Sequence, residues 1–395
     1  MNEFSGTGDF DISIKTMFNL EDILAREIEQ MGGKSIDIAT RIVHCRGDVD
    51  FLFKANLYLR TALRVLVPVV SFEARNPEEL YDKASLVQWE QFLDHNGSFA
   101  IDPVIHSARF PHSHYAALKL KDAIVDYFRK KNNSRPDVDV VDPVMRFNLH
   151  IDDDQVNISL DSSGRSLNQR GYRISGARAP LNEVLAAGMV YLTGWNGDVP
   201  FYDPMCGSGT IAIEAALMSG NIAPGLINPN FGFARWKQFD SNKWEDILRT
   251  AKGAIKKNDV RIFASDMDGA SIAVAQQNMK RAGVHDRIEL KQSDFLQLEP
   301  STETGMMIIN PPYGERLEEG NVVELYREIG SRLKHTWSGH TAWIISSHLE
   351  AMKGIGLKPI RKQKLLNGTL ECTFNGYELF RGARKDFVVE RKGER

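Results

Sequence analysis

The fold is decided by residues 199–210, which read Val199-Pro-Phe-Tyr-Asp203-Pro-Met-Cys-Gly207-Ser-Gly209-Thr210. The first five residues are mostly apolar and predict a buried strand, and the two glycines allow a tight turn before a helix. In an open sheet of parallel strands, ligands bind beside the turns that follow the strands. These residues therefore predict a strand, a glycine turn and a helix, with a ligand site at the turn.

The alternation of strand and helix continues along the rest of the chain. Apolar strands separated by helices are typical of a parallel, doubly wound sheet. Residues 221–258 are rich in Pro, Gly, Phe and Trp, and they predict an insertion rather than part of the sheet. The further strands are expected at residues 261–265, 288–291, 306–309 and 343–347, with a helix at 269–282.

The glycine turn fits two kinds of ligand site. Gly207-x-Gly209-x-x-Ala212 matches the pattern of dinucleotide sites. Asp203 argues against a dinucleotide, because its carboxylate would repel a pyrophosphate seated nearby. The same carboxylate suits the cationic ammonium of a methionine, so S-adenosylmethionine is the favoured ligand.

Acidic residues follow two further strands. Asp266, in Ser-Asp-Met-Asp268, can accept hydrogen bonds from both hydroxyls of a ribose, although Asp268 is equally well explained as a helix N-cap. Asp294 can accept from an adenine amino group, while the ring of Phe295 packs on the base. Together with Asp203, these strand ends predict a site for a nucleoside-containing methyl donor.

A rigid prolyl turn follows the fourth strand, where residues 307–314 read Met-Ile-Ile-Asn310-Pro311-Pro312-Tyr313-Gly. Each proline restricts the residue before it to extended geometry. The Asn310 side-chain oxygen and the Pro311 carbonyl can each accept one hydrogen of an aromatic amine, which points the nitrogen lone pair at a methyl group. Tyr313 can stack on the base. The alternative is a proline-rich loop that only ends a strand, but the acidic strand ends favour methyl transfer to an amino group.

The N-terminal part of the chain predicts two small modules. The first follows the order βαββαβ, which is that of a ferredoxin-like unit. Its elements are expected at residues 10–14, 20–31, 35–39, 41–45, 48–60 and 65–70. The second is a small α/β module over residues 77–161, with strands expected at 98–106, 144–151 and 155–160 and an amphipathic helix at 115–131.

Two groups of cations are candidates for RNA contact. On the solvent-facing side of the amphipathic helix lie Lys119, Lys121, Arg129, Lys130 and Lys131. In the linker that follows the second module lie Arg165, Arg170 and Arg173. Guanidinium groups are good phosphate ligands. The alternatives are a solvated helix face for the first group and carboxylate ion pairs that clamp the two halves of the chain for the second.

Composition limits the other possibilities. The net charge is -3, from 49 Lys+Arg against 52 Asp+Glu, so any nucleic-acid surface must be a local patch. The three cysteines lack C-x-x-C spacing, which makes a disulfide framework, a zinc ribbon or another metal site unexpected. No apolar run is long enough to cross a bilayer and no leader is recognisable, so we expect a cytoplasmic protein without a membrane anchor.

Several motifs together resemble one family. They are residues 203–210, Asn310 to Tyr313, Asn168-Gln-Arg-Gly-Tyr-Arg173, Ala179-Pro-Leu-Asn-Glu-Val-Leu-Ala186 and Leu366-Asn-Gly-Thr-Leu-Glu-Cys372. The chain resembles the bacterial THUMP-domain RNA methyltransferases, and within them the guanine-N2 methyltransferases of large-subunit (23S) ribosomal RNA. The resemblance covers nearly the whole chain.

The resemblance implies roles for individual residues. Asp203, Gly207 and Gly209 would line the methionine part of S-adenosylmethionine, Asp266 its ribose and Asp294 its adenine. The catalytic set that would face the target amine is Asn310, Pro311, Pro312 and Tyr313. The full set expected at the methyl donor is Asp203, Pro204, Cys206, Gly207, Gly209, Thr210, Asp266, Met267, Asp294, Phe295 and Asn310.

The expected organisation is an N-terminal ferredoxin-like domain (1–70), a THUMP RNA-binding domain (71–163), a linker (164–180) and a Rossmann-like methyltransferase domain (181–395). The expected function is methylation of guanine N2 in large-subunit ribosomal RNA, with the RNA or an assembling ribosomal particle as partner. Adenine-N6 methylation of RNA or DNA is the first alternative, because the Asn-Pro-Pro-Tyr motif serves both. A non-catalytic RNA-binding protein is the second. The modified nucleotide and the oligomeric state stay open.

Overall fold

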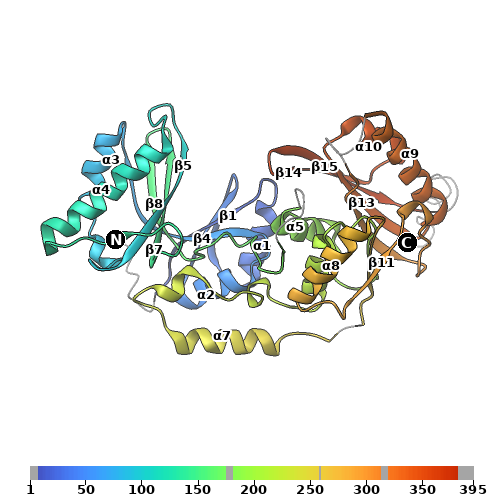
Figure 1. The fold of residues 1–395 in the computed structure, drawn as a ribbon, viewed down its shortest axis with the longest axis horizontal. Coiled ribbons are helices and arrows are strands. Elements are labelled where there is room, and N and C mark those ends of the chain that lie inside the picture. The colour runs from blue at the N-terminus through green and yellow to red at the C-terminus, as the bar shows by residue number, and fades with distance from the viewer. Residues whose placement is uncertain (1–7, 175–180, 258, 313–318, 381–395) are drawn as a thin grey trace. The chain divides into compact units, whose positions relative to one another are not determined.

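The computed structural model describes residues 8–174, 181–257, 259–312 and 319–380, which form two compact units (Figure 1). The first unit contains the chain up to Thr16, Leu24–Leu167 and Pro229–Thr250. The second contains Met17–Ile23, Asn168–Asn228 and the chain from Ala251. Each unit has its own sheet.

An eight-stranded sheet organises the first unit, in the order β2-β3-β1-β4-β8-β7-β5-β6. Its strands are β1 (Phe10–Thr16), β2 (Lys34–Ala39), β3 (Ile42–Gly47), β4 (Ala62–Glu73), β5 (Ser98–His106), β6 (Asp137–Val138), β7 (Met145–Asp152) and β8 (Gln155–Asp161). Its helices are α1 (Glu21–Gln30), which spans the division between the units, α2 (Val49–Tyr58), α3 (Pro77–Ala84) and α4 (Ser113–Asn132). The two predicted modules therefore share one sheet.

The shared sheet is continuous because β4 is long enough to pair on both sides. β4 pairs antiparallel with β1 of the ferredoxin-like module and with β8 of the second module. Its register places Val65 beside Ile14 and Val67 beside Leu160, and all four side chains are at most 2 % exposed. Alternate residues of a strand point to opposite faces. The apolar cores of both modules therefore lie on the same face of the sheet.

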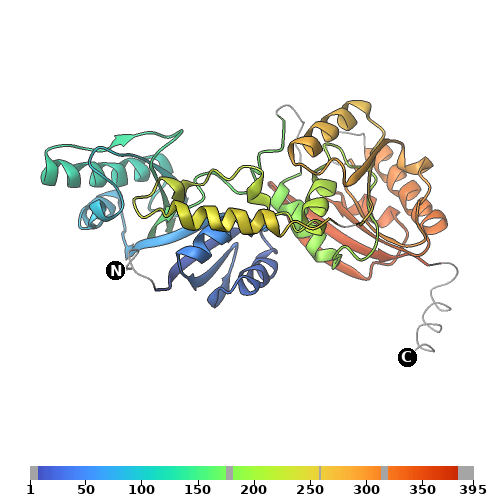
Figure 2. The same cartoon turned by 90° about the horizontal axis from the view of Figure 1, so that it is seen from below.

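The central part of the predicted insertion, Pro229–Thr250, belongs to the first unit, although it interrupts the sequence of the second. Phe233 stacks on Phe53 of α2 with ring centroids 4.4 Å apart, and Trp244 meets the edge of the same ring at 6.0 Å. Lys243 pairs with Asp50 at 2.7 Å. Trp244 and Lys243 lie on α7 (Ser241–Gly253), the long yellow helix of Figure 2. Aromatic residues of the insertion thus complete a core of the first unit.

The second unit is a seven-stranded sheet in the order β11-β10-β9-β12-β13-β15-β14. The pairs among β11, β10, β9, β12 and β13 are parallel, whereas β15 is antiparallel to β13 and β14. The strands are β9 (Phe201–Asp203), β10 (Ile262–Asp266), β11 (Ile288–Gln292), β12 (Gly305–Ile309), β13 (His340–Ser346), β14 (Arg361–Asn367) and β15 (Leu370–Glu378). The helices are α5 (Glu183–Thr193), α6 (Thr210–Ser219), α8 (Gly269–Arg281), α9 (Glu319–Thr336) and α10 (Leu349–Gly354).

The predicted fold class is confirmed. The chain combines a ferredoxin-like module and a second α/β module with a mostly parallel, doubly wound sheet. Each strand predicted for the C-terminal half lies at or next to its expected position. Among the residues that the structure describes, no helix is both long and apolar enough to span a membrane.

Candidate active site

The candidate site lies where the strand order of the second sheet reverses. The chain proceeds from β9 outward through β10 and β11 on one side, and from β12 to β13 on the other. Open parallel sheets bind ligands at this switch point, beside the carboxyl ends of the strands. Met307 of β12 pairs with Tyr202 of β9, so Asp203 and Asn310 follow at the same edge of two neighbouring strands.

Backbone hydrogen bonds hold the glycine turn after β9. The N–H of Cys206 donates to the Ser265 carbonyl at 2.8 Å, and the N–H of Gly207 donates to Asp266 Oδ2 at 2.9 Å. The N–H of Gly209 donates back to the Cys206 carbonyl at 2.8 Å. Hydrogen bonds therefore hold the turn against the end of β10, and the Asp266 side chain accepts one of them.

The two glycines of this turn have different surroundings. Both have positive φ, +52° at Gly207 and +82° at Gly209. A Cβ at Gly207 would meet no atom within 4 Å, whereas a Cβ at Gly209 would lie 3.1 Å from Met279 Cε and 3.2 Å from Ala275 Cβ. Gly207 thus borders open space that a ligand can enter, and Gly209 lets α8 pack against the turn.

Asp203 is buried with one carboxylate oxygen unsatisfied. Its side chain is 0 % exposed, and Oδ2 accepts from the N–H of Ala212 at 3.1 Å. Oδ1 has no hydrogen-bond partner in the described part of the chain. The pKa of this carboxyl is raised to about 8, chiefly by burial and also by the nearby Asp266, while the hydrogen bond from the Ala212 N–H opposes the shift. A buried acceptor of this kind fits a cationic group such as an ammonium.

Asp266 and Asp268 have separate tasks. Asp266 accepts from the N–H of Gly207 through Oδ2 and from the N–H of Asp268 through Oδ1, the latter at 2.9 Å. A carboxylate oxygen can accept a second hydrogen bond, so Asp266 is able to take ribose hydroxyls as well. Asp268 accepts from the N–H groups of Ala270 and Ser271 and is the N-cap of α8. The N-cap interpretation of Asp268 is therefore confirmed.

The structure brings Asp294 to the next strand end but moves Phe295 away. Asp294 Oδ1 accepts from the N–H of Leu296 at 2.9 Å. The Phe295 side chain is 1 % exposed and stacks on Trp337 at 6.1 Å, inside the core. Its predicted packing on an adenine is wrong, because the ring faces away from solvent. Met267, which is 71 % exposed, offers apolar surface beside Asp266 instead.

The prolyl turn begins with an unpaired acceptor. Asn310 directly follows β12, and its Oδ1 is buried without a hydrogen-bond partner among the described residues. Pro311 is buried and Pro312 is partly buried. Tyr313, the fourth residue of the predicted catalytic set, lies outside the described residues. The arrangement therefore leaves an amide oxygen available to an N–H donor next to the turn after β9.

The remaining residues predicted to line the methyl-donor site belong to the turn after β9. Pro204, Cys206 and Thr210 all lie between the end of β9 and the start of α6. Cys206 is 8 % exposed, and burial raises the pKa of its thiol well above the ordinary range, so it remains a neutral thiol. No cluster of His, Cys, Asp or Glu suited to a metal ion occurs in the described residues.

The α4 cations predicted to contact RNA lie on the surface and mostly pair with acidic neighbours. Lys119 pairs with Glu78 and Lys121 with Asp122, Arg129 with Asp126 and Lys131 with Glu90, and Lys130 is exposed. Exposed ion pairs contribute little free energy. A phosphate can therefore displace these carboxylates at small cost, and RNA contact by α4 stays a prediction.

The linker arginines behave differently from one another. Arg165 donates to the Asn230 carbonyl and lies 5.4 Å from the centre of the Phe231 ring. Arg170 is 3 % exposed, with Nε 3.6 Å from Glu214 Oε1, and Arg173 pairs with Glu183 at 3.1 Å. Burial makes the Arg170 guanidinium inaccessible to a phosphate. Arg170 and Arg173 thus form ion pairs with carboxylates, as the alternative prediction states. Both ion pairs join residues of the second unit, so they do not clamp the two units together.

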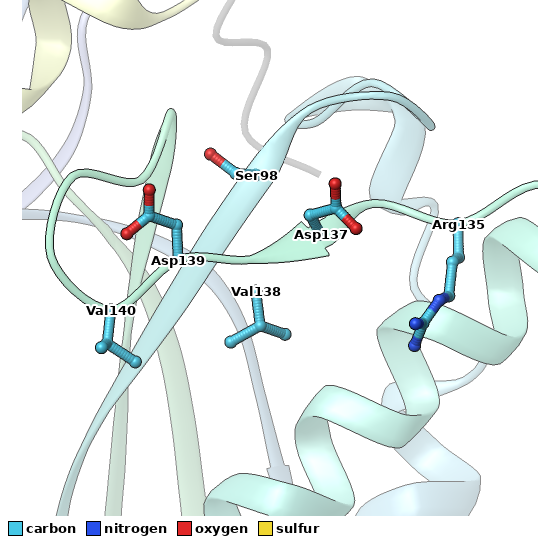
Figure 3. A pocket seen from close by; sticks show the side chains of 6 residues that line it. All are labelled: Ser98, Arg135, Asp137, Val138, Asp139 and Val140. Atoms are coloured by element: carbon cyan, nitrogen blue, oxygen red, sulfur yellow. The ribbon is translucent and has the colours of Figure 1, made fainter.

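A hollow in the first unit offers no alternative site for a phosphate. It lies beside β5 and β6, and its lining residues are Ser98, Arg135, Asp137, Val138, Asp139 and Val140 (Figure 3). The two carboxylates would repel an anion. The candidate site is therefore the sheet edge of the second unit.

Comparisons with known proteins agree with this division. Residues 170–375 match a family described as RMKL-like, methyltransferase domain. Residues 74–161 match the THUMP domain, and residues 11–66 match the RlmL ferredoxin-like domain. These three matches cover the two modules of the first sheet and the sheet that carries the candidate site.

Individual relatives extend over nearly the whole chain. A ribosomal RNA large subunit methyltransferase K/L of Shewanella amazonensis is 37% identical over 383 residues, which is 95% of this chain and 54% of the relative. The Synechocystis protein named "Putative RNA methyltransferase slr0064" is 36% identical and covers 91% of this chain and 94% of its own length. The chain thus spans about half the length of the K/L relatives it matches.

Solved structures share the fold over similar lengths. SMU.472, described as a putative methyltransferase complexed with SAH, has a TM-score of 0.86 at 28% identity and covers 96% of this chain and all of its own. A Listeria monocytogenes protein described as a "predicted N6-adenine-specific DNA methylase" has a TM-score of 0.85 at 31% identity and covers 95% of this chain and 98% of its own.

Proposed function

This chain belongs to the RMKL-like methyltransferase family, and we propose that it transfers a methyl group from S-adenosylmethionine to an exocyclic amino group of a base in RNA. The favoured target is guanine N2 of large-subunit ribosomal RNA. The observation that carries this proposal is the buried, unpaired Asn310 Oδ1 at the end of β12, one strand away from the turn after β9.

The proposed donor site consists of the turn after β9 and the ends of β10 and β11. Asp203 Oδ1, which lacks a partner, would accept from the ammonium of the methionine part. Asp266 would accept from the ribose, and Asp294 from the adenine amino group. Gly207 would leave room for the methionine backbone, because no atom lies within 4 Å of its Cβ position. When bound, S-adenosylmethionine supplies an electrophilic methyl group on a sulfonium.

The prolyl turn would hold the target amine. Asn310 Oδ1 and the Pro311 carbonyl would each accept one N–H of the amino group, so that the nitrogen lone pair points toward the donor methyl. Holding the two reactants in line removes much of the entropic cost of the reaction. Stacking of the base on Tyr313 stays part of the proposal. A base within a helix must also be flipped out, at a cost of a few kcal/mol.

The RNA target rests on the modules of the first unit. A ferredoxin-like and a THUMP domain precede the methyltransferase domain, and the K/L relatives are named for large-subunit ribosomal RNA. We propose that this unit, through the α4 cations and Arg165, grips RNA beside the target base, either as naked RNA or in an assembling ribosomal particle. Adenine N6 of RNA or DNA is the second candidate target, because one solved neighbour is described as a "predicted N6-adenine-specific DNA methylase".

The test is nucleoside analysis after methyl transfer. Purified chain and tritiated S-adenosylmethionine are incubated with ribosomal RNA and ribosomal particles from cells that lack the gene, and the products are digested and separated. Label in N2-methylguanosine supports the proposal, and label in N6-methyladenosine shifts it to the second target. Absence of label in every RNA, with intact donor binding, would overturn RNA methylation.

A variant of Asn310 tests the mechanism. Asn310→Ala should leave the Kd of S-adenosylhomocysteine within about twofold and reduce kcat at least about a hundredfold, because oriented acceptors contribute on that scale. Asn221→Ala is the matched control, since its amide lies on the surface and bonds to the Ala254 carbonyl. Turnover of Asn310→Ala near that of the control would contradict the role of Asn310.

A further inference from the structure

Asn278 is a buried asparagine that joins two segments far apart in the sequence. It lies in α8 and is 1 % exposed. Its Nδ2 donates to the Ser208 carbonyl at 2.9 Å, and its Oδ1 accepts from the N–H of Ile174 at 3.0 Å. Ser208 lies between the two glycines of the turn after β9, and Ile174 belongs to residues 168–174, which are part of the second unit. One side chain thus connects that segment to the turn.

The same segment reaches the turn a second time through Arg173. Its guanidinium donates to Thr210 Oγ1 at 3.4 Å and to the Leu181 carbonyl at 2.8 Å. Tyr172, which is fully buried, donates to Glu214 Oε1 of α6 at 3.2 Å. The segment therefore contacts both helices that flank the turn, α6 and α8.

The bond to Ser208 holds from outside a peptide plane of the turn whose other hydrogen bond lies within the turn itself. Cys206 and Gly207 are tied to the end of β10 through their N–H groups. The Ser208 carbonyl shares its peptide plane with the N–H of Gly209, which donates to the Cys206 carbonyl. Asn278 Nδ2 sets the orientation of that plane. Both flanking residues are glycines with positive φ, and since glycine can adopt many other backbone conformations, the turn needs outside contacts to keep this one.

We propose that Asn278 is a positioning residue of the methyl-donor site, which couples donor binding to the docking of residues 168–174. This inference rests on the proposed donor site at the turn. Since the coupling is thermodynamic, it is reciprocal: the donor should stabilise the docked segment by the same factor by which the docked segment improves donor affinity. Residues 168–174 follow the first unit directly in the chain. Any change that loosens the contacts of residues 168–174 with α6 and α8 would therefore weaken the binding of the methyl donor.

The experiment measures both directions of the coupling in the full chain, with S-adenosylhomocysteine as the probe. Asn278→Ala should raise the Kd of S-adenosylhomocysteine about five- to tenfold, a factor within the usual range for coupling between two sites. In the wild type, saturating ligand should slow hydrogen exchange of the Ile174 amide. In Asn278→Ala that ligand-dependent slowing should be lost. Asn278→Ser, which keeps a small polar group in place, should show the same two effects and serves if the alanine variant folds poorly.

Asn56 provides the matched control. It is 2 % exposed, and it bonds to the Leu52 carbonyl, Ser162 Oγ and Ser163 Oγ within the first unit. Asn56→Ala should lower thermal stability while leaving the ligand Kd and the Ile174 effect unchanged. Wild-type ligand affinity in Asn278→Ala, or ligand-dependent slowing that persists there, would overturn the coupling. Unaltered binding by Asp266→Ala would instead place the donor elsewhere and contradict the proposed function.

Discussion

Donor affinity should rise steeply between pH 6 and pH 7, because Asp203 must ionise when a cationic ligand arrives. Burial holds the pKa of this carboxyl at about 8 in the free protein. The negative charge of Asp266 further disfavours ionisation of Asp203, and the buried Cys206 stays neutral. Ligand binding therefore requires the carboxyl to release its proton.

The size of the effect follows from the ionised fraction. With a pKa of about 8, roughly 1 % of Asp203 is ionised at pH 6 and roughly 9 % at pH 7. The ligand's α-ammonium has a pKa near 7.7–8.0 and so stays charged over this interval. If only the ionised carboxyl binds, Kd should fall about tenfold across this unit of pH, and about one proton should be released per ligand bound.

The stability of the ligand-free protein should fall as pH rises, whereas its affinity for the methyl donor should increase, and both changes depend on Asp203. In the unfolded chain this carboxyl ionises near its ordinary pKa of 3.8, whereas in the folded protein it keeps its proton to about 8. The ligand-free protein therefore loses stability progressively as pH rises from about 4 to about 8. Asp203→Asn, which cannot ionise, should unfold at a higher temperature than the wild type at pH 7 but bind ligand weakly.

Calorimetric titration with S-adenosylhomocysteine checks these values. Titrations at pH 6.0, 6.5 and 7.0, each in two buffers of different ionisation enthalpy, give Kd and the number of protons released. Asp203→Asn should show no proton release and a flat profile. A wild-type Kd that is constant over this range, without proton release, would refute the assignment of Asp203 to the ammonium.

Three further predictions concern the glycine turn, the α4 cations and the insertion. Gly209→Ala should lower the free energy of unfolding by about 1–3 kcal/mol, because the added Cβ would press on Met279 and Ala275. Gly207→Ala should lower it by only about 1 kcal/mol and should mainly weaken ligand binding. Denaturant titration measures the first effect and calorimetric titration with the ligand measures the second. Replacing Lys119, Lys121 and Lys130 with Gln should reduce the slope of log Kd for RNA against log salt by about two, and an unchanged slope would exclude α4 from the contact. A chain that ends at residue 167 lacks Phe233 and Trp244, which leaves Phe53 exposed. Its melting temperature should therefore be lower than that of the first unit in the full chain. Equal melting temperatures would contradict the packing role of the insertion.

Strand positions could be predicted from the sequence because they depend on local periodicity, but strand partners could not. The predicted strand 65–70 is the centre of β4, which extends over Ala62–Glu73. Its two halves pair with β1 and β8, and no local pattern specifies that pairing. The hairpin of β14 and β15 was not predicted, although Gly368 stands first in the two-residue loop between the paired Asn367 and Leu370, a position where glycine is common in hairpins.

Within the candidate site, residues at strand ends could be predicted and side-chain environments could not. Asp203, Asp266, Asp294 and Asn310 are recognisable because the turns after parallel strands meet at one edge. Phe295 sits in an equally suggestive position, yet its ring fills the core beside Trp337. The contacts of Asn278 could not be predicted, since one asparagine on an amphipathic helix is ordinary and its hydrogen-bond partners are 70 and 104 residues away in the sequence.

Two unpaired oxygens at the ends of neighbouring strands explain why this edge is suited to transfer between two ligands. Asp203 Oδ1 and Asn310 Oδ1 are both buried without partners in the described residues. Each such acceptor costs the ligand-free protein about 1–3 kcal/mol. In the proposed function, the ammonium of the methyl donor would offset the first cost and a hydrogen of the target amine would offset the second. Because these two ligands would bind different atoms on adjacent strands, each could bind without displacing the other, and both could occupy the site when the methyl group is transferred.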